Sequence, residues 1–527
     1  MSTHRSSSST TKPNLVAVIG TTGVGKSQLG VELAKSLSLR KSPPSSAEVL
    51  NHDSMQCYRG LDVITNKATE EEMEGVPHHL MNFLDPGGEW RVNDFQRDAL
   101  AKIEELETRE ALPICVGGTT YYLQNLIFPN QLVSEPSQSQ QSTTTLVGST
   151  RSMDDISAFP PSLREAIENL PEELRQLFLV IPALPATSTP DDFPNPFPLY
   201  LLPPRLRSPD TLTPALYRLL QLVDPLSAER WHWRDIRKVR RAIDIVWEGR
   251  RWNDVVSAQQ EKSNEGSRFR TLVFWLYAEN EQLHPRLDGR VDKMIERGLL
   301  NELDELWKVA QDSTREGTID YSKGIYQAIG YKEFEPYLSA RHRDLSRTLE
   351  NDSELRSLFE QGVEQMKIAT RQYAKRQVKW IKSKLLPAVH KLEDPGDVTV
   401  VLFDASDLSK WKENVQTPAI KFLDAFLNHQ PLVDPLTLSP AAALHLAPPQ
   451  SEDAQAKLKR ACEICTRDPS KPFMVEERQW SSHIKTKSHR MQAQKKSGKP
   501  RGERRKAELE TIEAAVDKTS LEGQRTE

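Results

Sequence analysis

Gly20-Thr21-Thr22-Gly23-Val24-Gly25-Lys26-Ser27 is the stretch that decides the fold of this 527-residue chain. The apolar run Leu15–Ile19 precedes it and predicts a buried strand, and Gln28–Ala34 follows it and predicts the start of a helix. A strand, the pattern G-x-x-x-x-G-K-S/T and a helix, in this order, are the context of a phosphate-binding P-loop. The flanking elements disfavour an ordinary glycine-rich turn. The stretch therefore predicts a polyphosphate site, but not which polyphosphate binds or what reaction follows.

The residue types of this loop suit an anion. Glycines let successive backbone N–H groups curl around it, and the helix N-terminus adds the positive end of its dipole. Lys26 supplies a mobile positive charge, Thr22 offers a hydroxyl to a phosphate oxygen, and Ser27 offers an oxygen ligand to Mg²⁺. We expect the whole stretch to bind phosphate groups: Gly20, Thr21, Thr22, Gly23, Val24, Gly25, Lys26 and Ser27.

Strands and helices alternate from Pro13 to about Phe128, a pattern typical of a parallel α/β sheet. Two further strands are predicted at Glu48–His52 and Leu112–Val116, and they run into Asp53 and Thr119 respectively. Ligands of open α/β sheets bind outside the carboxyl ends of the strands. The P-loop, Asp53 and Thr119 are therefore expected to share one crevice.

Asp53 is a lone acid at a strand end, where acids often form turns or caps. Beside the P-loop it could instead hold Mg²⁺ through water or accept a proton from an attacking nucleophile, and the residues alone leave these roles open. Gly117-Gly118-Thr119 follows Val116, where many nucleotide hydrolases carry a Mg²⁺-holding acid. This weakens a motor or GTPase interpretation. Arg290, taken alone, reads as a surface arginine.

Changes of composition divide the chain into seven expected parts. They are a disordered tail (1–12), a first part of the P-loop core (13–128), an insertion (129–262), a second part of the core with a basic helix (263–430), a linker (431–455), a zinc finger (456–496) and a polar tail (497–527). Within the insertion, 129–214 is expected to be largely flexible apart from a helical patch at 162–179, and 215–262 to be helical. Arg270–Tyr277 and Val398–Phe403 are expected to be strands.

Two predicted helices carry clustered positive charge. One spans roughly Leu355–Leu386, where basic residues recur every four positions: Lys367, Arg371, Lys375 and Lys379. The other places Ile236, Val239 and Ile243 on one face and puts Arg237, Lys238, Arg240 and Arg241 on the others. Such stripes fit either a solvated helix face or a nucleic-acid contact. Tyr373 and Trp380 are expected to be core anchors.

Cys462-x2-Cys465, followed by His483-x5-His489, predicts a structural Zn²⁺ site with two thiolates and two imidazoles. The alternative is an accidental cluster. Residues 471–506 carry twelve Lys/Arg and three Glu, so a finger here would attract phosphates, or the segment could be a nuclear localisation signal.

The whole chain carries a net charge of −4 and four cysteines, which indicates a reducing compartment rather than a disulfide scaffold. Apolar runs of eighteen residues are absent, so no membrane span or membrane partner is expected. Met1–Lys12 lacks the apolar centre of a secretory signal, which leaves a plain tail or a weak organellar targeting segment.

Taken together, these stretches resemble the tRNA dimethylallyltransferases (isopentenyltransferases), and they occur in the order of that family over roughly residues 14–390. The stretches are Gly20–Ser27, Asn51–Tyr58, Thr65–Ala68, Val76–Leu80, Val116–Leu123, Leu287–Asp292, Ile329–Phe334 and Thr370–Trp380. The finger resembles the matrin-type zinc finger of eukaryotic members. The chain departs from the family in its long, Pro-rich insertion and in His232-Trp233-Arg234-Asp235, where the family usually has His-Pro-Asn-Asp.

The resemblance implies a P-loop core with a helical insertion, and dimethylallyl diphosphate rather than ATP in the P-loop. The acceptor would be N6 of the adenosine 3′ of the tRNA anticodon, extruded from its stack. Asp53 would be the general base, and Thr22, Arg290, Lys26 and Mg²⁺ at Ser27 would steady the departing pyrophosphate. The tRNA anticodon arm would contact two groups of residues: Asp53, Ser54, Met55, Gln56 and Thr119 in the core, and Arg237, Lys238, Val239, Arg240, Arg241, Arg371 and Lys375 on the basic helices.

Two other classes of function stay open from the residues alone. One is a nucleotide or small-molecule kinase fused to a nucleic-acid-binding finger, and the other is a catalytically idle RNA-binding protein, which the intact Thr22, Lys26, Asp53 and Arg290 disfavour. For the transferase we expect a monomer in the cytoplasm, with mitochondrial and nuclear pools as further expectations.

Overall fold

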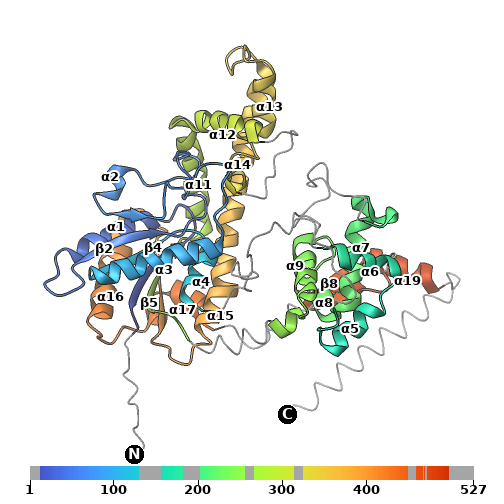
Figure 1. Ribbon diagram of the computed structural model, residues 1–527. Coiled ribbons are helices and arrows are strands. Elements are labelled where there is room, and N and C mark those ends of the chain that lie inside the picture. The colour runs from blue at the N-terminus through green and yellow to red at the C-terminus, as the bar shows by residue number, and fades with distance from the viewer. Residues whose placement is uncertain are drawn as a thin grey trace, which may run out of the picture. The chain divides into compact units, whose positions relative to one another are not determined.

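The structure is a computed structural model that describes residues 12–129, 156–181, 202–255, 266–313, 324–448, 459–466, 468 and 472–497. The chain divides into two compact units. In Figure 1 the colour follows the residue number from blue at the N-terminus to red at the C-terminus. One unit contains 1–134 and 259–449, and the other contains 135–258 and 450–527. Two low-complexity stretches were expected, at 134–141 and 185–209; the first lies outside the described residues, as does 185–201 of the second, whereas 202–209 is described and includes the 3-10 helix η6 Pro204–Leu206. Across the described ranges, no helix is long and apolar enough to cross a membrane.

A six-stranded, all-parallel sheet forms the centre of the first unit (Figure 1). The strand order is β3-β2-β4-β1-β5-β6. The strands are β1 Asn14–Gly20, β2 Ser46–Asn51, β3 His78–His79, β4 Ala111–Val116, β5 Arg270–Tyr277 and β6 Val398–Asp404. The α/β architecture and the five longer strands expected from the sequence are confirmed. The two-residue β3 was not anticipated.

Helices cover both faces of this sheet because its central strands are apolar on both sides. On β1, Leu15, Ala17 and Ile19 face one hydrophobic cluster, whereas Val16 and Val18 face the other. The first cluster includes residues of α3 Val92–Thr108, α4 Thr120–Ile127 and α17 Pro440–Leu446, and the second includes residues of α1 Lys26–Leu37 and α16 Thr417–Leu427. The segment 431–449, expected as a linker, therefore contributes to the core, since Ala442 and Leu446 are buried there.

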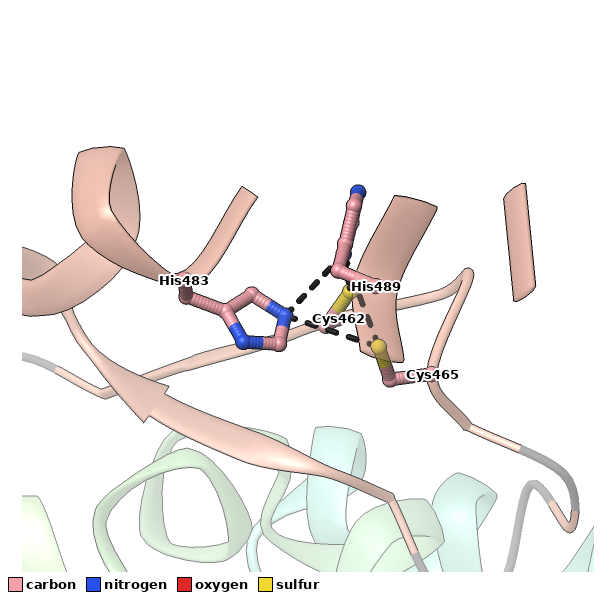
Figure 2. A group of neighbouring side chains, drawn as sticks. All are labelled: Cys462, Cys465, His483 and His489. Carbon is pink, nitrogen blue, oxygen red and sulfur yellow. Dashed lines mark hydrogen bonds between the residues drawn. The ribbon is translucent and has the colours of Figure 1, made fainter. Parts of the chain in front are cut away.

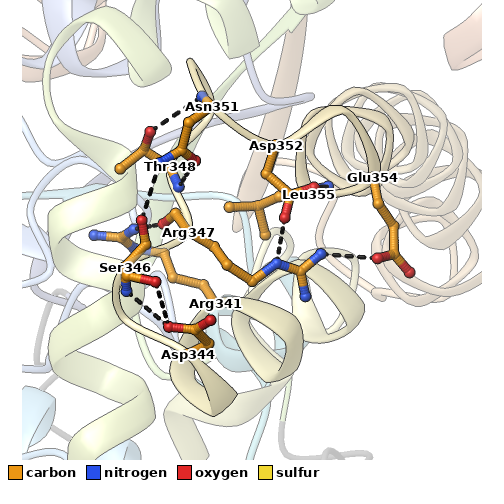
Figure 3. Close-up of polar contacts among 9 residues, drawn as sticks. All are labelled: Arg341, Asp344, Ser346, Arg347, Thr348, Asn351, Asp352, Glu354 and Leu355. Carbon is orange, nitrogen blue, oxygen red and sulfur yellow. Dashed lines mark hydrogen bonds and ion pairs between the residues drawn. The ribbon is translucent and has the colours of Figure 1, made fainter.

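The long basic helix is α14, Ser353–Trp380. It packs on α11 Asn280–Glu296 and on α13 Glu335–Arg343, and it continues through the π-helical η9 Ile381–Leu385 into α15 Leu386–Val389. Asp352 caps its first turn by accepting a hydrogen bond from Leu355 N at 3.0 Å. Arg347 donates both to Asp352 and, at 2.8 Å, to Glu354 (Figure 3). The helix start is thus fixed by its preceding loop.

Further helical elements complete the first unit. They are α2 Glu70–Met73, α12 Leu299–Ser313, η8 Gly324–Gln327, η10 Leu408–Lys410, η11 Lys412–Gln416 and η12 Pro435–Thr437.

The second unit contains a helical part and the Cys/His segment. The helices are α5 Pro161–Glu168, α6 Glu172–Val180, η6 Pro204–Leu206, α7 Pro209–Val223, α8 Pro225–Arg230 and α9 Ile236–Trp247. The Cys/His segment has a hairpin, β7 Lys459–Ala461 and β8 Met474–Glu476, followed by α18 Glu477–Ile484 and α19 Lys487–Ser497. The helical patch expected at 162–179 forms α5 and α6, and α7 begins at Pro209, six residues before the helical region expected at 215–262. Leu212 and Leu216 of α7 are buried and belong to the hydrophobic core of this unit.

Candidate active site

One cavity opens at the carboxyl ends of β1, β2 and β4 and has a volume of about 760 Å³. It is lined by residues from the P-loop, the turn after β2, the turn after β4, and helices α11 and α14, among them Thr22, Lys26, Asp53, Gly118, Arg290 and Tyr373. The predicted convergence of the P-loop and Asp53 therefore occurs. Thr119, from the turn after β4, is not part of the lining but supports it, because its Oγ1 accepts a hydrogen bond at 3.2 Å from the backbone N–H of Ser54, which lines the cavity.

The position of Asp53 is fixed by its own turn. Asn51 Oδ1 accepts a hydrogen bond from Asp53 N at 2.9 Å, and Asn51 Nδ2 donates to Leu80 O at 2.9 Å. Asp53 Oδ1 accepts from Met55 N at 3.0 Å. The remaining carboxylate oxygen, Oδ2, is on the side of Gly118, since a Cβ at Gly118 would lie 3.2 Å from it.

The two glycines after β4 are required by close approach. A Cβ at Gly117 would lie 2.6 Å from the carbonyl carbon of His52 and 2.8 Å from Asp53 N. Both neighbours are backbone atoms, so a larger residue would displace the strand end that carries Asp53. This contact explains why glycine stands here in place of the acid that ordinary nucleotide hydrolases carry.

Positive charge is concentrated in the cavity. Arg290 Nη1 donates a hydrogen bond to Thr22 Oγ1, and Lys26 Nζ donates to Thr21 O at 2.7 Å. Burial lowers the pKa of Lys26 to about 8, with Asp53 opposing this shift and Arg290 adding to it. Burial likewise lowers the pKa of Arg290 to about 10, again opposed by Asp53. Next to Asp53, the two buried cations Lys26 and Arg290 outnumber the carboxylate, which makes this end of the cavity a site for an anion, whereas Glu32, Glu72, Glu74 and Arg376 line other parts of it.

The outer side of the P-loop is supported by residues that no sequence motif singles out. Gly25 has φ of +87°, and a Cβ there would lie 2.6 Å from Trp411 Cη2. The indole nitrogen of Trp411 donates to Glu32 on α1 at 3.0 Å. Arg286 donates to Gly23 O at 3.3 Å and to Ala405 O at 3.1 Å, so the segment after β6 holds the loop.

Gln377 and Tyr373 of α14 form another wall: Gln377 was not anticipated from the sequence, and Tyr373 was expected to be a core anchor but lines the cavity. Gln377 Oε1 accepts a hydrogen bond from Thr22 N at 2.9 Å, and Nε2 donates to Gly118 O at 3.0 Å. Burial raises the pKa of the Tyr373 phenol. Thr370, Tyr373 and Gln377 follow the i, i+3, i+7 spacing of one helix face, and this spacing was the available signal.

The other predicted RNA-contact residues of the first unit are in different environments. Met55 lines the cavity. Gln56 Nε2 is engaged with the protein backbone, at 3.2 Å from Thr65 O and 3.0 Å from Asn66 O. Arg371 forms an ion pair with Asp288, at 2.5 and 2.6 Å from its two oxygens, whereas Lys375 is exposed. The expected basic stripe is therefore partly neutralised along α14.

Within α9, two predicted RNA contacts are placed in the interior. Val239 is 1% exposed and belongs to the core of its unit, and Arg240 is 7% exposed. The buried guanidinium of Arg240 is satisfied by hydrogen bonds that it donates to Asp244 Oδ1 at 2.8 Å and to Ile181 O. These two side chains are therefore buried in the structure, and the tRNA contacts that the resemblance implies for residues 237–241 stay a prediction. Lys238 is exposed, Arg241 is partly exposed, and the side chain of Arg237 lies outside the described set.

The four predicted zinc ligands converge, and their donor atoms all lie within 4.8 Å of one another (Figure 2). Nδ1 of His489 lies 3.4 Å from Cys462 Sγ and 3.5 Å from Cys465 Sγ, and Nε2 of His483 lies 3.6 Å from Cys465 Sγ. Ligand bonds of about 2.0–2.3 Å in a tetrahedron give edges of about 3.3–3.8 Å. The cluster has the donor set and the size that suit Zn²⁺.

Comparison with known proteins identifies the family of this chain. The model of the family described as IPP transferase matches residues 56–174 and 204–384, more than half of the chain. The tRNA dimethylallyltransferase of Schizosaccharomyces pombe is 34% identical over 498 residues, which cover 93% of this chain and 96% of the relative. That of Saccharomyces cerevisiae is 31% identical over 484 residues, covering 90% and 91%.

A solved structure of a eukaryotic dimethylallyltransferase acting on tRNA has a TM-score of 0.61 and 27% identity, and the match covers 95% of this chain and 100% of that chain. These findings do not favour the kinase alternative. The chain belongs to the IPP transferase family, whose members named above are tRNA dimethylallyltransferases, as the resemblance of its motifs implied.

Proposed function

We infer that this protein transfers a dimethylallyl group from dimethylallyl diphosphate to N6 of the adenosine 3′ of the anticodon in tRNA, and releases pyrophosphate. The observation that carries the inference is the convergence of Asp53 with two buried cations, Lys26 and Arg290, in one cavity. A base and an anion site side by side are what a nucleophilic displacement of diphosphate requires.

The reaction divides between the two sides of the cavity. The N6 lone pair forms a bond to the allylic carbon while the bond from that carbon to the diphosphate oxygen breaks, and the oxygen leaves with the electron pair. Asp53 accepts the proton that N6 loses. Thr22, Arg290 and Lys26 form hydrogen bonds to the departing pyrophosphate. The negative charge of the pyrophosphate raises the pKa of Lys26 and Arg290 again, so that both side chains are charged.

Mg²⁺ and Zn²⁺ have separate places in this proposal. Ser27 offers an oxygen donor at the cavity, the ligand type that Mg²⁺ prefers, and a Mg²⁺ ion there would neutralise part of the diphosphate charge. Cys462, Cys465, His483 and His489 would hold Zn²⁺ as a closed structural site.

The finger, together with the exposed Lys238 and Lys375, would contact the backbone of the anticodon arm. We propose a monomer, with its main pool in the cytoplasm.

Mass analysis of tRNA nucleosides tests the function. Purified protein, dimethylallyl diphosphate and unmodified tRNA should yield N6-dimethylallyladenosine, and Asp53→Asn should lower its formation by about 10²-fold or more while tRNA binding persists. Asp62→Asn is the matched control, because that carboxylate is 60% exposed and pairs with Lys67. Unmodified nucleosides with the wild-type protein would refute the function, and full turnover by Asp53→Asn would refute the assigned base.

A further inference from the structure

Gln377 joins two loops of the active-site cavity through one side-chain amide. It accepts from the backbone N–H of Thr22, in the P-loop, and donates to the carbonyl of Gly118, in the turn after β4. The residue is 5% exposed. Because only one end of the amide can donate, these two contacts fix which way it points.

The two backbone groups belong to opposite sides of the proposed reaction. The side chain of Thr22 receives the hydrogen bond of Arg290, so this loop positions the groups that act on the leaving pyrophosphate. Gly118 lies against the base: a Cβ built there would meet Asp53 Oδ2 at 3.2 Å and Gln377 Nε2 at 2.5 Å. The Gln377 amide therefore spans the gap between the base side and the leaving-group side.

The helix that carries Gln377 is anchored to the helix that carries Arg290. Arg371 of α14 binds both carboxylate oxygens of Asp288 of α11, at 2.5 and 2.6 Å. Lys367 adds a second ion pair, to Asp292, at 2.6 Å. Gln377 and Arg290 thus extend from two joined helices toward the same P-loop residue, Thr22.

We propose that Gln377 is a positioning residue that sets the separation between Asp53 and the pyrophosphate-binding groups at Thr22. It acts through two backbone groups, without a bond to the reacting atoms. The proposal rests on the transferase function inferred above. Attack and departure at one carbon depend on this separation, and a displacement of about 1 Å costs roughly 10²-fold in rate.

The first test compares Gln377→Met with Gln372→Met. Methionine keeps the length of the side chain and removes both hydrogen bonds, and Gln372 is an exposed glutamine on the same helix. We expect kcat of Gln377→Met to fall by about 10²-fold with KM for tRNA changed by less than about twofold, and Gln372→Met to match the wild type. A kcat of Gln377→Met within about twofold of wild type would overturn the proposal.

Gln377→Glu supplies a readout that a purely structural role would not move. An ionised carboxylate accepts from Thr22 N–H but has no proton for Gly118 O, whereas the protonated acid makes both bonds. Burial favours the protonated form, so kcat of this variant relative to wild type should rise as pH is lowered from about 8 to about 6. A ratio that stays flat with pH contradicts the proposal, even if the methionine variant proves unstable.

Binding of inorganic pyrophosphate separates this proposal from the function on which it rests. Gln377→Met should bind pyrophosphate more weakly than both the wild type and Gln372→Met, because Thr22 is no longer held in place. An unchanged affinity would overturn the role of Gln377 and leave the transferase function standing. Failure of the wild-type protein to modify tRNA would refute the transferase function, while the pyrophosphate comparison, which needs no tRNA, would still decide whether Gln377 holds Thr22 in place.

Discussion

Replacing Lys26 by arginine should remove a pH dependence of pyrophosphate binding that the wild-type protein shows between about pH 7 and pH 9. In the free protein, burial lowers the pKa of Lys26 from 10.5 to about 8. A fall of that size corresponds to roughly 3 kcal/mol of destabilisation of the charged ammonium. Arginine keeps its charge over the same range, and the pKa of the neighbouring Arg290 is about 10.

The affinity for pyrophosphate should fall as pH rises, because the anion binds the charged form of Lys26. Below pH 8 Lys26 is charged in the free protein and binds pyrophosphate directly, whereas above pH 8 it is neutral and must take up a proton on binding. With a pKa of about 8, the charged fraction falls from about nine-tenths at pH 7 to about one-tenth at pH 9. The affinity of wild-type protein relative to Lys26→Arg should therefore fall by about tenfold across this range.

Isothermal titration calorimetry at three pH values measures this ratio. The ionisation of pyrophosphate itself affects both proteins equally, so it cancels in the comparison. Repeating the titration in two buffers with different ionisation enthalpies should show uptake of nearly one proton by the wild type at pH 9 and of less by Lys26→Arg. Parallel pH profiles for the two proteins would mean that Lys26 stays charged when the cavity is empty, and would refute the burial argument.

Three further predictions concern the supporting structure. Gly117→Ala should lower kcat by about 10²-fold, measured as initial rates of tRNA modification, because its Cβ would lie 2.6 Å from the His52 carbonyl carbon; unchanged rates would show that the strand end yields at no cost. Cys462→Ser should abolish bound zinc in metal analysis and make tRNA binding weaker and less dependent on salt, and zinc-free wild-type protein would contradict the site. Asp352→Ala should lower the melting temperature. The Arg347 and Leu355 hydrogen bonds lower the pKa of Asp352 to about 2, so this deficit should be full above about pH 4 and shrink as pH falls toward 2; a deficit that does not change with pH would exclude the ion pair as its cause.

Much of the core and of its anion site was predictable because both depend on local signals. The apolar strand, the glycines and the helix start around Lys26 are adjacent in sequence, and the parallel sheet brings other strand ends to the same edge. The position of Asp53 in the cavity was therefore predictable from the sequence, whereas Thr119 lies behind Ser54, one step from the lining. The convergence of the two cysteines and two histidines was predictable in the same way, since thiols and imidazoles at this spacing serve few other purposes.

Helix periodicity gave a less complete account of charge. It placed Val239 on an apolar face, and only the family resemblance suggested an RNA contact there; the structure buries this residue. Periodicity placed Arg240 away from that face, but Asp244 and the Ile181 carbonyl satisfy its guanidinium inside the unit. Arg371 belonged to a basic stripe in the sequence and is paired with Asp288 in the structure. A charge pattern does not show which partners will neutralise it.

The sequence by itself determined the P-loop, the parallel sheet that carries it, the acid beside it and the Cys/His finger, because each depends on residue types at short spacing. Only the tertiary structure decided what surrounds the loop: Gln377 between Thr22 and Gly118, Trp411 against Gly25, and Arg290 on Thr22. These contacts join residues far apart in the chain, and two of the three involve backbone atoms or a bare Cα. Such contacts have no pattern in the sequence, since they depend on where the backbone of another segment lies.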